Sequence, residues 1–255
     1  MTDAIDSFTA SMRGEFIDET GETLNSLDII TGNLRSGQEK SEASLPKLRG
    51  MANGLKNSAA AAGFPLVQLV MHRLGDYLEA LKDTPAQALD DIQQFSDKAR
   101  QLIAASAPAI DSAELVRQLP AKRYSFDVKD VALPNPVEVL MVIKEKTAGM
   151  LFERELRACG LRVNMLQNSF EAIEMAVRTK PDYIIISGVL DELSGIDLCS
   201  AFAAMPTTQK IPVSLLTSMD ANSPELKKLP ASISLIRKNH FGDDLANALA
   251  KHSIL

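Results

Sequence analysis

The sequence predicts a two-domain protein of the α plus α/β class, with an N-terminal antiparallel helical bundle followed by a five-stranded, parallel, doubly wound sheet. Three observations lead to this prediction. The first hundred residues repeat apolar side chains at three- and four-residue spacing, as amphipathic helices do. After residue 136, short apolar runs alternate with amphipathic segments, as in a parallel sheet covered by helices. Between the two patterns lie Pro108, Pro120, Pro134 and Pro136.

The domain boundaries follow from these changes of pattern. We expect a helical bundle over residues 1–106, a linker over residues 107–136 and an α/β domain over residues 137–255. Each domain is long enough to bury a core of its own. Within the linker, a capping pattern from Asp111 predicts a short helix that ends before the next proline, and alternation over residues 124–128 favours extended chain.

Four helices are expected in the bundle, joined by short connections. The first has an apolar stripe and ends between Gly32 and Gly37, and a polar loop follows over residues 36–44. The second is expected to begin near Leu45 with a proline in its first turn. The second helix is expected to end at Gly63. The third helix is expected at residues 66–81 and the fourth at residues 85–105.

The second domain alternates five predicted strands with helices. The strands are expected at residues 139–143, 161–165, 183–186, 213–216 and 233–236. The helices are expected at residues 147–159, 169–179, 195–204, 223–229 and 241–251.

Residues 137–252 resemble a response-regulator receiver domain, with a fold like that of flavodoxin. The resemblance rests on the first and third strands, on the loop Leu190-Asp-Glu-Leu-Ser-Gly195, and on a fourth strand that ends in a hydroxyl at Thr217. Lys238 ends the fifth strand, where receivers place a lysine. The intervals support this register: 43 residues from Lys144 to Ser187, 30 more to Thr217 and 21 more to Lys238.

The resemblance implies a phosphate-accepting acidic pocket that this sequence has lost. Receivers hold Mg²⁺ with two acids after the first strand and a phosphoacceptor aspartate after the third, since this ion prefers oxygen ligands. These acids map to Ile143 and Lys144, and the phosphoacceptor maps to Ser187. Glu145 is the one acid left beside them. We therefore expect a pseudo-receiver that takes no aspartyl phosphate and needs no metal or other cofactor, although the switch positions Thr217 and Lys238 are retained.

The bundle resembles a histidine phosphotransfer domain through the stretch Leu48-Arg-Gly-Met-Ala-Asn53-Gly-Leu-Lys56-Asn57-Ser58-Ala59, with Gly63 and Phe64 after it. Members of that family have the phosphorylated histidine where Asn53 stands, and a glycine where Asn57 stands. An asparagine side chain lacks the nucleophilic ring nitrogen, so the phosphohistidine step is expected to be absent.

The same helix offers a candidate docking surface, because its apolar stripe leaves another face outward. This surface comprises Arg49, Asn53, Lys56, Asn57 and Ala60. A merely solvated helix face explains these residues equally well. His72 is the one histidine of the bundle, and its position away from the leucine stripe predicts an exposed side chain.

Composition and charge exclude several classes of function. Residues 1–120 contain 11 Lys/Arg and 17 Asp/Glu, and residues 121–255 contain 16 of each, so neither half has the basic excess that nucleic-acid binding requires. Signal-peptide features and membrane-length apolar runs are lacking, which favours a cytoplasmic protein. Walker, GxGxxG, GxSxG and zinc-ligand patterns are also lacking, so we expect no enzyme.

The leading functional hypothesis is a non-catalytic adaptor of bacterial two-component signalling. It would bind a histidine kinase, a phosphotransfer protein or a response regulator, and two copies could pair through the receiver-like domain near Arg237. One alternative keeps phosphotransfer through His72 or Ser187. Another is a small-molecule or nucleotide sensor that binds an anion through Lys144, Thr217 and Lys238.

Overall fold

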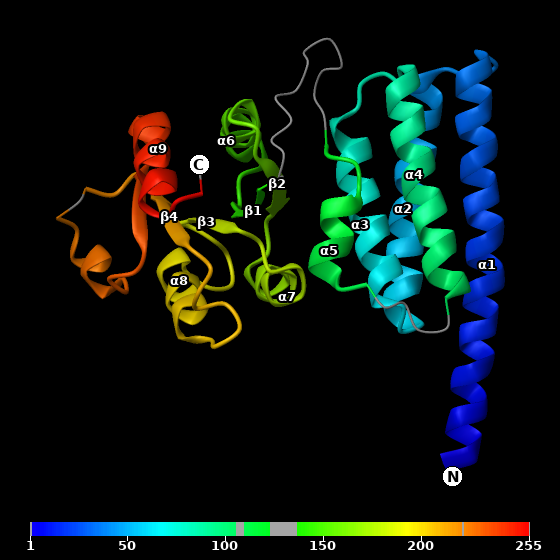
Figure 1. Cartoon of the computed structure of the whole chain (residues 1–255), viewed down its shortest axis with the longest axis horizontal. Coiled ribbons are helices and arrows are strands. Elements are labelled where there is room, and N and C mark those ends of the chain that lie inside the picture. Colours follow the sequence, from blue (N-terminus) through cyan, green and yellow to red (C-terminus); the bar gives the residue numbers. More distant parts are fainter. Residues whose placement is uncertain (1, 106–109, 123–136, 221, 255) are drawn as a thin grey trace. The chain divides into compact units, whose positions relative to one another are not determined.

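The computed structural model describes residues 2–105, 110–122, 137–220 and 222–254, with side chains from residue 11 onward. The chain divides into two compact units, residues 1–129 and 130–255. The first unit is helical and the second is built on a five-stranded parallel sheet (Figure 1). This confirms the predicted fold class.

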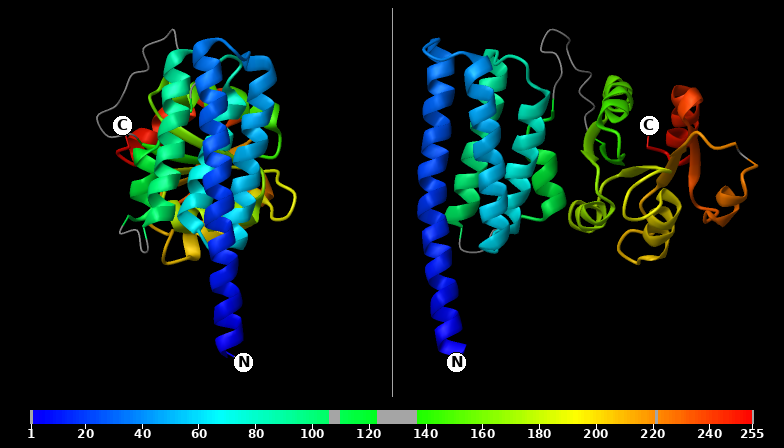
Figure 2. Two further views of the ribbon diagram at one scale, coloured as in Figure 1. Left: turned by 90° about the vertical axis from the view of Figure 1, so that its right-hand side faces the viewer. Right: turned by 180° about the vertical axis from the view of Figure 1, so that it is seen from behind.

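The first unit is a four-helix bundle in which α1 packs against α2 and α4, and α3 packs against the same two helices. Short connections make sequence neighbours antiparallel. Along the chain the helices are α1 (Thr2–Ser36), α2 (Ser41–Ala61), α3 (Pro65–Ala80) and α4 (Ala86–Ala104). Figure 2 shows α1 extending beyond the other three helices at its N-terminal end. The core is formed by fully buried apolar side chains, among them Leu24, Leu27, Leu48, Ala52, Leu74, Leu78, Ile92 and Phe95.

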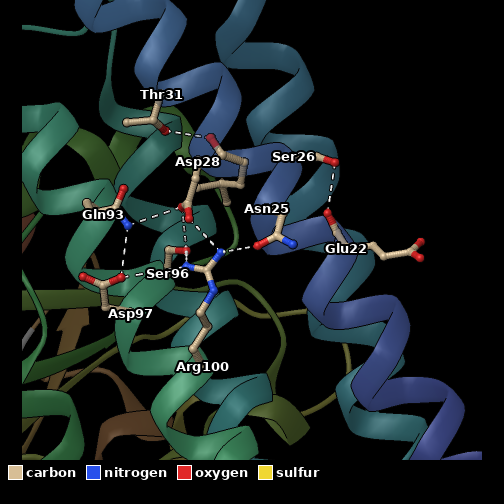
Figure 3. A network of polar contacts seen from close by, with 10 residues as sticks. Glu22, Asn25, Ser26, Asp28, Thr31, Gln93, Ser96, Asp97 and Arg100 are labelled. Carbon is tan, nitrogen blue, oxygen red and sulfur yellow. Dashed lines mark hydrogen bonds and ion pairs between the residues drawn. The ribbon is translucent and has the colours of Figure 1, made fainter.

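A polar network fixes α1 against α4 at the edge of this core (Figure 3). The guanidinium group of Arg100 lies 2.7 Å from the carboxylate of Asp28 and donates to Asn25 Oδ1 over 3.0 Å. Ser96 Oγ donates to the same Asp28 carboxylate over 2.9 Å. Because both charged side chains are about two-thirds covered, the network orients the two helices more strongly than an exposed pair would.

Two predictions about the start of α2 are wrong. The polar loop is shorter than expected, since α2 already begins at Ser41, so Pro46 lies in the second turn and not in the first. Ser44 explains the early start: its backbone N–H donates to the carbonyl of Lys40, and its hydroxyl donates to Glu39 Oε2 over 2.5 Å. Pro46 faces solvent, where the helix tolerates a missing backbone donor.

A short helix, α5 (Ser112–Gln118), lies within the segment predicted as a linker and ends before Pro120, as the sequence predicted. It buries Leu115 and Val116 and packs against α3. The predicted extended stretch at residues 124–128 lies outside the described residues. The linker boundaries remain a prediction.

The second unit has one parallel sheet with the strand order β2-β1-β3-β4-β5. Its strands are β1 (Glu138–Val142), β2 (Arg162–Leu166), β3 (Tyr183–Ser187), β4 (Val213–Thr217) and β5 (Ser234–Arg237). The three central strands are buried along their whole length, which explains their continuous apolar runs.

Helices cover both faces of this sheet (Figure 1). They are α6 (Lys146–Ala158), α7 (Ser169–Thr179), α8 (Gly195–Ala204) and α9 (Phe241–Lys251). On one face, α6 and α9 meet through Phe152 and Phe241, whose ring centroids are 4.6 Å apart. On the other face, α7 lies over β1 and β2, and α8 lies over β3 and β4. The helix expected at residues 223–229 is a 3₁₀ segment, η1 (Pro224–Lys228), and a second one, η2 (Lys238–His240), precedes α9. None of the described helices has both the length and the apolar character needed to cross a membrane.

Candidate functional site

The carboxyl ends of β1, β3 and β4 lie side by side and bring the predicted pocket residues to one edge of the sheet. The register pairs Val142 with Ile186 and Ser187 with Leu216. Parallel strands that end together project the following loops to the same edge, where ligands of this fold class usually bind. This edge therefore collects the β1–α6 loop (residues 143–145), the β2–α7 loop (residues 167–168) and the β3–α8 loop (residues 188–194).

The first predicted pocket position, Ile143, belongs to the hydrophobic core. Its side chain is 1% exposed and packs in the cluster beneath α6 and α9. A Cβ atom added to Gly149 would lie 2.7 Å from Ile143 Cγ2 and 2.5 Å from Met165 Sδ. The glycine thus lets α6 approach the isoleucine closely, and the position offers no polar atom to a ligand.

Ser187 and Thr217 lie at the ends of neighbouring strands, and both are 3% exposed. The carbonyl of Ser187 is covered closely by the start of α8, where a Cβ atom on Gly195 would lie 2.2 Å from it. Thr217 Oγ1 accepts a hydrogen bond from the backbone N–H of Met219 over 3.0 Å. Both hydroxyl-bearing side chains are therefore buried at this edge of the sheet.

Lys144 points to the β3–α8 loop, where its ammonium group is paired with the carboxylate of Asp191. Hydrogen bonding to Asp191, with the charges of Asp191 and Glu145 adding to it, raises the pKa of Lys144 above its ordinary value. The lysine is thus a permanent positive charge at this edge. Its backbone carbonyl also accepts a hydrogen bond from Gln167 Nε2 over 2.8 Å, which attaches the β2–α7 loop.

Glu192, the next residue in the β3–α8 loop, binds the start of α7. Its carboxylate accepts hydrogen bonds from Asn168 Nδ2 over 2.6 Å and from Ser169 Oγ over 2.9 Å. The hydrogen bond from the Ser169 side chain is the largest cause that lowers the pKa of Glu192. Asn168 caps the same helix by accepting from the backbone N–H groups of Phe170 and Glu171. Asp191 and Glu192 therefore attach the β3–α8 loop to the β1–α6 loop and to the β2–α7 loop with the start of α7, respectively.

The residues at this edge do not fit Mg²⁺. Ile143 is apolar, Ser187 is neutral and buried, and Asp191 is already paired with an ammonium group. Glu145 stands exposed at the beginning of α6. No group of three metal-binding side chains occurs among the residues that the structure describes. A divalent ion needs several free oxygen ligands, whereas the oxygen atoms of Asp191 at this edge already bind the Lys144 ammonium group.

The three residues considered for anion binding are not brought together by any described contact. Lys144 pairs with Asp191, and Thr217 bonds to Met219. Lys238 follows the strand pair Thr217–Arg237 and begins η2 with a partly exposed side chain. Anion binding by these three residues stays a prediction.

In the bundle, Asn53 lies exposed on α2 and faces α3 at a glycine. A Cβ atom on Gly75 would lie 3.8 Å from Asn53 Oδ1. One turn earlier, the guanidinium group of Arg49 donates to the carbonyl oxygens of Leu78 and Leu81 over 2.9 and 3.0 Å. Arg49 was predicted to be part of the docking surface, but it is half-buried and caps the end of α3.

The rest of the predicted docking surface is small and largely uncharged. Asn53, Asn57 and Ala60 are exposed, and Lys56 is partly exposed. Gly50 and Gly54 are also exposed on this face, and a Cβ atom on either would meet nothing within 4 Å. Mid-helix glycines cost helix stability, so the packing of the bundle does not explain these two.

The predicted exposure of His72 is wrong. Its side chain is 11% exposed, and its Nε2 atom lies 3.6 Å from the Asp76 carboxylate one turn later. The periodicity placed His72 off the leucine stripe correctly, but packing around α3 covers that position as well. A largely covered ring is poorly placed to accept a phosphoryl group from a partner.

Sequence reasoning did not find the contacts of Asp191, Glu192 and Gln167. A signal was present, because two adjacent acids follow the third strand in the loop that resembles the receiver loop. Their partners are 47 and 24 residues away in the sequence, so their pairing depends on the fold.

No protein-family model matches the chain. Among curated proteins, the chain is similar to the response regulator MprA of Mycobacterium sp. strain KMS, with 25% identity over 96 residues, which is 38% of this chain and 41% of that protein. It is also similar to the response regulator PleD of Caulobacter vibrioides, with 28% identity over 96 residues, or 37% of this chain and 21% of that protein. A third relative is the phosphate regulon transcriptional regulatory protein PhoB of Rhizobium meliloti, with 27% identity over 92 residues, or 36% of this chain and 40% of that protein. The match thus spans less than half of each of these relatives.

Solved structures give comparable matches. The chemotaxis response regulator CheY4 of Vibrio cholerae has 21% identity and a TM-score of 0.40, covering 46% of this chain and 98% of that one. The N-terminal domain of a response regulator receiver protein from Methanoculleus marisnigri has 22% identity and a TM-score of 0.38, covering 45% of this chain and 94% of that one.

Proposed function

We propose that this protein, whose second unit is a response-regulator receiver-type domain, acts as a phosphate-independent adaptor in two-component signalling. In this proposal it binds a histidine kinase, a phosphotransfer protein or a response regulator and carries no phosphate itself. Its effect on signalling comes from occupying a partner's docking surface.

The observation that carries the proposal is the composition of the sheet edge. A receiver accepts phosphate with a carboxylate nucleophile and a bound divalent ion. Here a hydroxyl, a core isoleucine and a lysine paired with an acid stand at those positions, namely Ser187, Ile143 and Lys144. The absence of a carboxylate nucleophile and of acids for an ion at these three positions supports partner binding as the proposed activity.

The bundle supplies the proposed docking surface, redefined as Gly50, Asn53, Gly54, Asn57 and Ala60. It resembles the phosphotransfer face in position, and its residues are small or uncharged, with the partly exposed Lys56 beside them as the one long, positively charged side chain of the predicted surface. An uncharged asparagine at its centre can contact a receiver's acidic pocket without the repulsion that an acid would cause. A receiver domain with an intact acidic pocket is therefore the partner that this surface fits best.

Labelled acetyl phosphate with Mg²⁺ tests the chemical part of the proposal. We expect no label on the intact protein, and none after incubation with a phosphorylated phosphotransfer protein. An acyl phosphate is cleaved by hydroxylamine, whereas a serine phosphate is not, so the two acceptor chemistries are separable. Stoichiometric label of either kind on the wild-type protein would contradict the proposal.

Affinity measurements with purified receiver domains test the binding part. Wild-type protein and an Asn53→Glu variant are compared, because a carboxylate at the centre of the surface would repel an acidic pocket. We expect at least a tenfold loss of affinity in the variant. A matched charge change on another helix, Gln101→Glu in α4, controls for the change in net charge and should leave affinity unchanged.

A further inference from the structure

We infer that the ammonium group of Lys144 serves as a tethered cation, which holds the β3–α8 loop in the place where a divalent ion would otherwise join acidic loops. This inference rests on the proposed function, since it assigns the edge of the sheet a structural task in place of phosphate chemistry. It adds the prediction that the wild-type domain does not respond to Mg²⁺, because the Lys144 ammonium group already stands in the place of that ion.

The two ends of Lys144 contact different loops. Its side chain pairs with Asp191 in the β3–α8 loop, and its backbone carbonyl accepts from Gln167 in the β2–α7 loop. The preceding residue, Ile143, is held by its backbone N–H, which donates to the carbonyl of Leu166 over 2.9 Å. The lysine thus projects from a fixed backbone, and its charge reaches the neighbouring loop.

The other side of the β3–α8 loop is held independently. Glu192 accepts hydrogen bonds from Asn168 and Ser169 at the start of α7, and Ser194 caps α8 by accepting from the backbone N–H of Asp197 over 3.1 Å. With these contacts in place, the remaining acid of the loop is Asp191. The ammonium group of Lys144 binds Asp191, so the β3–α8 loop is attached both to the β1–α6 loop and to the start of α7.

The charges explain why this arrangement excludes a metal ion. A divalent ion that approached Asp191 would have to displace an ammonium group already paired with it, and would be repelled while doing so. Removal of the lysine charge leaves Asp191 without its partner, close to position 144, and the exposed Glu145 follows that position directly in the chain. Replacing the lysine by an acid should therefore convert the edge into a cation site with oxygen ligands.

Because both members of the pair are at least half exposed, with 50% of the Lys144 side chain and 61% of the Asp191 side chain accessible, solvent weakens their attraction. The pair is therefore expected to control the position of the loop and not the stability of the fold. Its loss should appear in local motions of residues 188–194, whereas global unfolding changes little.

The experiment compares the full-length wild-type protein with Lys144→Met, Lys144→Asp and the control Lys210→Asp. Lys210 is an exposed lysine before β4, so the control makes the same charge change at the opposite edge of the sheet. Backbone amide shifts and hydrogen exchange of residues 188–194 are followed during titration with MgCl₂, with NaCl keeping the ionic strength constant. Thermal unfolding is measured on the same samples.

We expect no Mg²⁺ response in the wild-type protein or in Lys210→Asp. In Lys144→Met, hydrogen exchange at residues 188–194 should become at least fivefold faster. In Lys144→Asp, added Mg²⁺ should shift these amides saturably and raise the midpoint of unfolding, as linkage to a bound ligand requires.

Three results would overturn the inference: saturable Mg²⁺ shifts at this edge in the wild-type protein, unchanged loop exchange in Lys144→Met, or a Mg²⁺ response of Lys144→Asp no larger than that of Lys210→Asp. None of these measurements involves phosphate or a partner. Failure of the tethered cation is therefore distinguishable from failure of the adaptor proposal, which depends on labelling and binding.

Discussion

Arg237 at the end of β5 and Asp244 in α9 form a two-point ion pair. Arg237 Nε donates to Asp244 Oδ2 over 2.8 Å, and Nη2 donates to Oδ1 over 2.7 Å. The backbone N–H of Arg237 also donates to Oδ2, over 2.9 Å. The pair joins the last strand to the last helix. The sequence suggested Arg237 for a contact between two copies of the protein. Because Arg237 binds Asp244 of its own chain, substituting it would disturb this ion pair as well, so it is a poor choice for testing such a contact.

This ion pair predicts a specific pH dependence of stability. The side-chain hydrogen bond from Arg237 is the largest cause that lowers the pKa of Asp244 from 3.8 to about 2. Because the pKa of Asp244 is lower in the folded than in the unfolded protein, its ionised carboxylate stabilises the fold at pH values above the unfolded-state pKa. This stabilisation disappears as the pH falls from about 4 to about 2. We expect Asp244→Asn to lose about 1 kcal/mol or less at pH 7, because solvent reaches half of the Arg237 side chain and screens the pair.

Urea unfolding of both proteins between pH 7 and pH 2.5 checks this prediction. The difference between wild type and Asp244→Asn should shrink steadily below pH 4. A difference that stays constant over that range would show that the carboxylate acts through packing and not through its charge.

Thr20 in α1 predicts a stabilising substitution. Its hydroxyl is fully buried and has no hydrogen-bond partner among the described residues. Valine has nearly the same shape and removes the unsatisfied hydroxyl, so Thr20→Val should raise the free energy of unfolding by about 1 kcal/mol. The matched control is Thr31→Val, because Thr31 Oγ1 donates to the carbonyl of Leu27 over 2.9 Å and is also buried. Chemical denaturation should show a gain for the first variant and a smaller gain or a loss for the second.

Gly54 on the docking surface predicts opposite effects on stability and on binding. A Cβ atom there meets nothing within 4 Å, so Gly54→Ala should stabilise the bundle by up to about 1 kcal/mol. If a partner docks closely on this face, the added methyl group should weaken its binding. Gly32→Ala in α1 is the matched control, since its Cβ atom also meets nothing and the residue lies outside the surface. Equal binding by both variants would leave the α2 surface without a role in docking.

Gly195 at the start of α8 predicts a destabilising substitution. A Cβ atom would lie 2.2 Å from the carbonyl oxygen of Ser187 and 2.7 Å from Gly188 Cα, and backbone atoms cannot move aside cheaply. We expect Gly195→Ala to lower the free energy of unfolding by about 1–3 kcal/mol. Gly149→Ala should cost less, because its close neighbours are the side-chain atoms Met165 Sδ at 2.5 Å and Ile143 Cγ2 at 2.7 Å, and side chains shift at a lower cost than backbone. Thermal unfolding of the two variants should rank them in this order, and the reverse order would contradict the argument.

The strands and most helices could be predicted closely from the sequence, because burial and periodicity act locally. The third strand was expected at residues 183–186 and is observed at Tyr183–Ser187, and the last helix occupies residues 241–251 as expected. The start of α2 could not be predicted in the same way. It depends on a hydrogen bond from Ser44 to Glu39, which begins the helix before its apolar stripe.

In the candidate site, too, the positions of the residues could be predicted from the sequence, but their contacts could not. The position of Ile143, Lys144 and Ser187 at the edge of the sheet could be predicted from the sequence, because strand lengths fix which residues reach that edge. That they stand in place of a receiver's acids is what the resemblance implies, and it stays a prediction. The direction of the Lys144 side chain does not follow from spacing. An exposed, flexible lysine turns toward whichever acid the fold brings within reach, and here that acid is Asp191.

The sequence by itself thus determined the fold class with its helical and α/β parts, and the order of strands and helices. These properties depend on residue type and local period. Only the tertiary structure decided that His72 is covered, that Arg49 caps α3, and that Lys144, Glu192 and Gln167 connect three loops. Each of these contacts joins segments or helix faces whose distance is set by packing, and no local pattern encodes that distance.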